Sequence, residues 1–116
     1  MIHDITAGHF DPAGIADHSA IATKPIKMRI VLALLVELGD EDADGVPTLD
    51  GWKVRFEDGC VILPWLGGRT NHVSEEFAIR LQRMTGCTLA DREHGQLIGA
   101  GELTGLNEQY ASQSGR

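Results

Sequence analysis

Between residues 50 and 68, polar and apolar residues first alternate and then give way to an apolar run. The alternating part, WKVRF at 52–56, is typical of a half-buried strand with its apolar side chains toward the core. The apolar run at 60–65 follows the turn sequence EDG at 57–59, where glycine tolerates a positive φ. We therefore predict a β-hairpin with its turn at 57–59, and we expect the other elements to pack on it.

Two further segments have the spacing of helices. Residues 26–38 carry large apolar side chains four positions apart and apolar residues between them. We predict a helix here, buried on nearly all sides and preceded by Thr23 as its cap; a buried strand is the alternative. A second helix is predicted for residues 74–85. Ser74 suits its N-cap, and Gly86 suits its C-cap.

Glycine and proline interrupt the pattern in the rest of the chain. Residues 1–24 have no sustained period and predict a mostly irregular N-terminal arm. We predict a single domain over residues 25–99 and a flexible C-terminal tail over residues 100–116. Tight turns between neighbouring strands predict an α+β fold, a small antiparallel sheet built on the central hairpin with about two helices packed on one face. An open sheet edge would allow a homodimer in place of a monomer.

The charge of the chain narrows the classes of partner. The 116 residues carry a formal net charge of −7, and their ten Lys and Arg are scattered. This surface disfavours nucleic acid, which requires a basic stripe, and it suits a basic protein partner that it can steer electrostatically. Solubility alone is the alternative role for the charge. The longest apolar run, 30–36, is too short to span a membrane, and we expect a cytoplasmic location.

The acidic segment DEDADG at 40–45 resembles the opening of an EF-hand calcium loop. Asp40, Asp42 and Asp44 stand at alternate positions where oxygen ligands converge on one cation. The twelfth position, where a bidentate glutamate belongs, is Gly51, and a strand is expected to follow in place of a helix. Calcium binding by these three aspartates is therefore one hypothesis, and a solvated acidic connection is the other.

The loop from Gly67 to His72 runs into the second predicted helix. Free backbone N–H groups at such a helix start attract anions, and Arg69 is suited to bind a carboxylate or phosphate. The loop lacks the spacing of a P-loop, so a tight turn with no ligand is the alternative.

Neither cysteine lies in a sequence that indicates catalysis. Cys60 and Cys87 have no metal-ligand spacing and no nucleophile signature around them. Buried, reduced thiols are expected, with a single disulfide as the alternative. We predict no catalytic residues and a chain that is not an enzyme.

The two tryptophans, Trp52 and Trp65, lie at the two ends of the predicted hairpin. Trp52 shares its face with other apolar residues, so we expect it in the core. Trp65 lies between Pro64 and Leu66 at a strand end, where it either closes the edge of the core or serves as an exposed anchor for a partner. Because both ends of a hairpin lie opposite its turn, the acidic segment and the Gly-Gly loop should meet. The residues of this predicted contact surface are Asp42, Asp44, Trp65, Arg69 and His72.

Residues 74–98, SEEFAIRLQRMTGCTLADREHGQLI, resemble a pattern found in small bacterial domains in which a helix ends in Thr-Gly and a strand leads into an acidic turn. These domains include immunity proteins that neutralise a toxin. The resemblance implies a non-enzymatic, acidic protein-binding module, including an immunity-type inhibitor of a basic partner, and it implies no particular functional residue. A calcium-binding domain and a small anion-binding or ligand-binding domain at Gly67–His72 are the alternatives.

Overall fold

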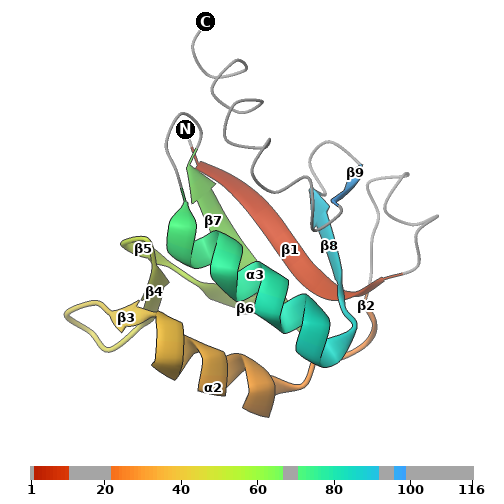
Figure 1. Ribbon diagram of the computed structural model, residues 1–116, viewed down its shortest axis with the longest axis horizontal. Coiled ribbons are helices and arrows are strands. Elements are labelled where there is room, and N and C mark those ends of the chain that lie inside the picture. The colour runs from red at the N-terminus through yellow and green to blue at the C-terminus, as the bar shows by residue number, and fades with distance from the viewer. Residues whose placement is uncertain (1, 11–21, 67–70, 92–95, 99–116) are drawn as a thin grey trace, which may run out of the picture.

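The computed structural model describes residues 2–10, 22–66, 71–91 and 96–98 (Figure 1). The larger sheet consists of β1 (Ile2–Phe10), β2 (Ala22–Lys24), β6 (Arg55–Glu57), β7 (Cys60–Leu66), β8 (Thr88–Asp91) and β9 (Gln96–Ile98). A smaller sheet consists of β3 (Asp40–Glu41), β4 (Pro47–Leu49) and β5 (Trp52–Lys53). The helices are α2 (Met28–Leu38) and α3 (His72–Thr85). The predicted α+β class, with an antiparallel sheet and two helices in the described residues, is confirmed.

Strand β1 lies in the middle of the larger sheet, whose order is β6-β7-β1-β8-β9 (Figure 1). It pairs antiparallel with β7 and with β8, and its end also pairs with β2. The expectation of an irregular arm over residues 1–24 is therefore wrong for residues 2–10 and 22–24, and the domain does not begin at residue 25. Residues 11–21 and the predicted tail, 100–116, lie outside the described residues.

The composition of β1 does not indicate a central strand. The strand sequence IHDITAGHF contains histidine, aspartate and glycine, which are common in loops. Pairing on both sides satisfies its backbone groups, so tertiary context outweighs local propensity. Gly8 fits because a Cβ atom there would lie 2.8 Å from Cys60 Sγ and 2.9 Å from the ring of Phe10.

The two helices lie on one face of the larger sheet (Figure 1). Helix α3 contacts β7 and β8, while α2 packs beside α3 and contacts β4. One row of buried side chains crosses four strands beneath the helices: Val61, Ala7, Leu89 and Ile98. The adjacent row points to the opposite face and runs from Arg55 through Ile62, Thr6 and Ala90 to Leu97. The sheet alternation thus assigns Asp4, Arg55 and Pro64 to the face away from the helices.

The predicted hairpin over β6 and β7 is confirmed, but it forms one side of the sheet and not its centre. Its first strand is also shorter than predicted. Residues 52–53 belong to the smaller sheet and residues 55–57 to the larger one, and the chain passes between them at the buried Val54. Trp52, on the smaller sheet, and Phe56, on the edge strand β6, are exposed, which contradicts the expectation that they pack in the core.

Two tight hairpins are each closed by an Asp-Gly pair. Asp50 and Gly51 connect β4 to β5, and Asp58 and Gly59 connect β6 to β7. All four residues have positive φ, between 50° and 86°. This backbone matches the right-handed twist of the strands, and Asp and Gly are the residues that tolerate it.

Asp50 also caps helix α3. Its Oδ2 accepts a hydrogen bond from the Ser74 N–H at 2.8 Å, and its Oδ1 accepts one from the Val73 N–H at 3.3 Å. The carboxylate therefore satisfies free N–H groups of the first turn and places negative charge at the positive end of the helix dipole.

Both predicted N-caps are wrong in position. The N-cap of α3 is Asn71, and Ser74 is buried inside the first turn. Thr23 lies in β2, where its hydroxyl donates to the His9 carbonyl at 3.0 Å, and α2 begins after Lys27. Gly86 is the C-cap of α3 in the left-handed conformation, as predicted.

We expect Asp50→Ala to lower the free energy of unfolding by about 1–2 kcal/mol more than Asp58→Ala. Both variants place alanine at a positive φ, so the difference isolates the cap on α3. Urea unfolding followed by circular dichroism measures it. Equal destabilisation by the two variants would show that the Asp50 carboxylate does not stabilise the helix.

Candidate functional site

The acidic segment at 40–45 folds as the β3–β4 hairpin. Oδ1 of Asp42 accepts hydrogen bonds from the N–H groups of Asp44, at 2.9 Å, and of Val46, at 3.0 Å. The Asp42 N–H in turn donates to the Val46 carbonyl, and the Gly45 N–H donates to the Asp42 carbonyl, each at 3.0 Å. Asp42 is therefore the residue that closes this loop.

These hydrogen bonds hold the Asp42 carboxylate in its ionised form. The Val46 N–H lowers the pKa of Asp42 most, and the Asp44 N–H and the charge of Lys53 lower it further. Lys53 Nζ lies 3.6 Å from Asp42 Oδ2.

This arrangement is not an EF-hand. A strand follows the loop in place of a helix, and Asp42 uses one oxygen for backbone donors. Across the described ranges 2–10, 22–66, 71–91 and 96–98, no three His, Cys, Asp or Glu side chains are grouped to hold a metal ion. Asp40, Asp42 and Asp44 are therefore not grouped around one cation position in this fold.

The other predicted site residues are spread over the molecule. Trp65 is 0% exposed, so the hypothesis of an exposed anchor is wrong. Its side chain lies on the same side of β7 as Leu63, toward the helices. His72 is exposed at the start of α3. Arg69, with the rest of 67–70, lies outside the described residues.

An exposed apolar stripe runs along α2. Met28, Leu32 and Val36, spaced four apart, are 39%, 49% and 85% exposed. The prediction that this helix is buried on nearly all sides is therefore wrong. Only the side that carries Val31, Leu34 and Leu35 is buried, because α2 packs beside α3 at the margin of the fold.

The stripe opens into a groove between α2 and the smaller sheet. The groove has a volume of about 440 Å³, and its lining residues are Leu32, Leu35, Val36, Gly39, Asp40, Glu41 and Pro47. Asp40 and Glu41 are exposed on β3. Glu37, also exposed, pairs with Arg80 of α3 at 2.7 Å. The groove therefore has an apolar floor and an acidic end.

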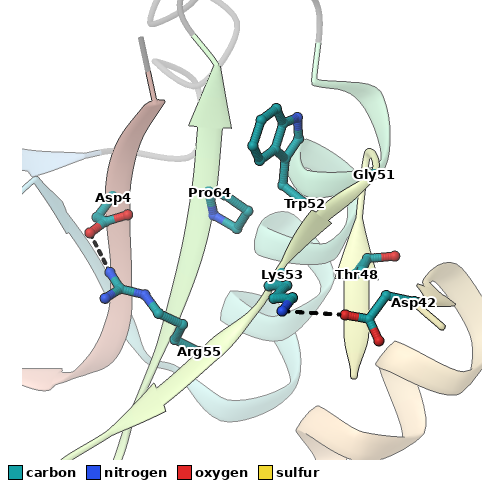
Figure 2. Close-up of a pocket in the computed structure, with 8 residues that line it drawn as sticks. All are labelled: Asp4, Asp42, Thr48, Gly51, Trp52, Lys53, Arg55 and Pro64. Atoms are coloured by element: carbon teal, nitrogen blue, oxygen red, sulfur yellow. Dashed lines mark hydrogen bonds and ion pairs between the residues drawn. The ribbon is translucent and has the colours of Figure 1, made fainter. Parts of the chain in front are cut away.

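A second pocket lies on the other side of the smaller sheet (Figure 2). Its volume is about 390 Å³, and its lining residues are Asp4, Asp42, Thr48, Gly51, Trp52, Lys53, Arg55 and Pro64. Arg55 pairs with Asp4 across β7, and Lys53 pairs with Asp42. Figure 2 shows Pro64 between these two ion pairs and the Trp52 ring above them.

The sequence predicted Trp52 in the core and left Trp65 either at the edge of the core or exposed, whereas the structure exposes Trp52 and buries Trp65. Trp52 is 41% exposed because it follows the Asp50-Gly51 turn directly. That dipeptide is the same turn signal as Asp58-Gly59, so reading both pairs as hairpin turns would have divided the 52–56 strand. The exposed stripe on α2 has no such local signal, since it depends on where α3 packs.

The two thiols are placed unfavourably for nucleophilic chemistry. Cys60 and Cys87 are both buried, and they form no disulfide within the described residues. Burial raises the pKa of the Cys87 thiol, which disfavours the reactive thiolate.

We expect Asp42 to titrate below its ordinary pKa of about 3.8. Because the folded-state pKa is lowered, its contribution to the hairpin is complete above the unfolded-state value and is lost as the pH falls through the folded one. The amide resonances of Asp44 and Val46 in ¹H–¹⁵N spectra should report this titration. Asp42→Asn, which keeps the Oδ1 acceptor, should remove the titration, while Asp44→Asn should leave the Val46 resonance titrating. A Val46 amide that does not titrate with Asp42 would contradict the assignment.

Comparisons of the chain with protein-family models, with curated proteins and with solved structures found no match. Neither α2 nor α3, the helices of the described residues, is long and apolar enough to cross a membrane.

Proposed function

We propose that this chain is a non-enzymatic protein-binding module that holds a basic, amphipathic segment of a partner in the groove between α2 and β3. The observation that carries the proposal is the exposed stripe on α2, of which Leu32 and Val36 line one groove with two acidic residues of β3. A partner segment of this kind has apolar side chains for the floor and Lys or Arg for the acidic end.

The apolar part supplies the affinity. Val36 is the most exposed large apolar side chain in the described residues, and Leu32 lies one turn before it. Burial of apolar surface releases about 25 cal/mol per Å², so covering this stripe favours association. Helix-in-groove recognition relies on apolar side chains spaced one turn apart on the partner.

The negative charges favour a basic partner and raise its association rate. The chain has a net charge of −7, and Asp40 and Glu41 concentrate negative charge at one end of the groove. Complementary charge raises association rates and disfavours acidic competitors. This distribution supports a basic partner.

An immunity-type inhibitor of a basic toxin is a specific form of this function. The resemblance of residues 74–98 to small bacterial domains and the acidic charge both support it. Such an inhibitor would cover a basic surface of the toxin with the groove and the β3–β4 hairpin. The contact residues proposed here replace Trp65, which is buried, with Leu32, Val36, Asp40 and Glu41.

A helical probe peptide with leucine on one face and lysine on the other tests the groove. We expect it to bind, with an affinity that falls as salt is raised, and to shift the resonances of Leu32, Val36 and Glu41 in NMR spectra. The same peptide with glutamate in place of lysine should bind at least roughly tenfold more weakly, because its charges are repelled.

Variants separate the two contributions. Val36→Lys should weaken binding of the lysine peptide roughly tenfold, about 1.4 kcal/mol, and the control Met84→Lys changes an exposed apolar residue on α3. Asp40→Asn with Glu41→Gln should slow association more than Asp58→Asn with Glu76→Gln, which removes the same charge elsewhere. Equal effects of each variant and its control, or resonance shifts outside the groove, would reject this surface.

A further inference from the structure

The pocket on the other side of the smaller sheet has a balanced set of charges. Asp4 and Asp42 provide two negative groups, and Lys53 and Arg55 provide two positive groups. Lys53 and Arg55 lie on either side of Val54, which is buried. Figure 2 shows the two ion pairs on opposite sides of Pro64.

In one of the two ion pairs, the cation already contacts two carboxylates. The Arg55 guanidinium donates to Asp4 Oδ2, and its other terminal nitrogen lies 3.5 Å from Glu57 Oε1. Arg55 thus has a carboxylate on each side and ties β6 to β1. This side of the pocket is structural.

The other ion pair is open to a ligand. Asp42 Oδ1 is used by two backbone N–H groups, whereas Oδ2 pairs, within the described part of the chain, with Lys53 at 3.6 Å, which is longer than a hydrogen bond. The Lys53 side chain is 63% exposed, and its ammonium has three donors. The pair can therefore accept one hydrogen bond at Oδ2 and donate others from Nζ without breaking a strong contact.

A ligand at this pair must match both charges. An anion alone would compete with Asp42 for Lys53, and a cation alone would compete with Lys53 for Asp42. A zwitterion places an ammonium on Oδ2 and a carboxylate on Nζ at once, and it leaves no charge uncompensated. In the same pocket, Pro64 and Trp52 offer apolar surface for the rest of such a ligand.

We propose that this pocket binds a free α-amino acid with an apolar side chain. Asp42 Oδ2 accepts from the α-ammonium, Lys53 Nζ donates to the α-carboxylate, and the side chain of the ligand lies on Trp52 and Pro64. The pocket volume of about 390 Å³ falls within the range of small-molecule sites, roughly 300–1,000 Å³. This site is separate from the groove on α2 and does not depend on it.

Three probes with the same side chain test the proposal: phenylalanine, N-acetylphenylalanine and phenylalanine amide. The indole N–H resonance of Trp52 reports binding, and the fully buried Trp65 serves as an internal control. We expect phenylalanine to shift the Trp52 resonance in a saturable way, and each blocked derivative to bind at least tenfold more weakly. Binding of a blocked derivative as tight as that of phenylalanine, or no shift at Trp52, would overturn the proposal.

Two variants test the named partners. Asp42→Asn removes the charge but keeps the Oδ1 acceptor that closes the hairpin, and Lys53→Met removes the ammonium from an exposed side chain. Each should weaken phenylalanine binding at least tenfold, and Lys53→Met should do so without changing the thermal unfolding midpoint by more than Arg83→Gln does. Arg83, exposed on α3, is the control for charge and should leave binding unchanged. Wild-type affinity in both pocket variants would reject the site, and binding of the lysine peptide to the α2 groove would be unaffected by that result.

Discussion

The pairing of β1 with both β7 and β8 is the constraint on which the rest of the structure depends. Ile2 pairs with Leu66 and Thr6 pairs with Ala90, so the start of the chain holds together two strands from its second half. Such long-range pairing costs loop-closure entropy, which the buried row from Val61 to Ile98 offsets. Helix α3 lies on this sheet, and α2 rests against α3. The groove and the pocket are therefore consequences of where β1 inserts.

The smaller sheet contributes residues to both candidate surfaces, the groove and the pocket. Its β3 strand forms the acidic end of the groove, and its β5 strand carries Trp52 and Lys53 to the pocket. Asp50 fixes this sheet to α3 through two hydrogen bonds, and the Val54 N–H fixes the following strand to the Pro47 carbonyl at 3.0 Å. A few polar contacts thus set the position of a sheet that is too small to be stable alone.

Binding of a basic segment in the groove and binding of an amino acid in the pocket would depend on different interactions. The groove offers apolar area with negative charge at one end, so affinity comes from burial and specificity from charge sign. The pocket offers matched opposite charges beside an indole, so it selects for a ligand that is itself charge-balanced. Asp42 closes the loop of the β3–β4 hairpin, which carries the acidic end of the groove, and it also lines the pocket. The same residue therefore affects both the groove and the pocket.

The sequence by itself determined the local elements of this protein. The Asp58-Gly59 turn, the two helices and the C-cap at Gly86 follow from residues close together in the chain, because turn and helix preferences are set by nearby backbone sterics. Only the tertiary structure decided which faces are covered. In the folded protein, residues 2–10 form a central strand, Trp65 is buried and Trp52 is exposed. Asp50 caps helix α3 in place of Ser74, and Met28, Leu32 and Val36 remain exposed. These outcomes depend on contacts between residues far apart in the chain, and a local pattern of apolar positions fixes which side chains share a face but not what packs against it.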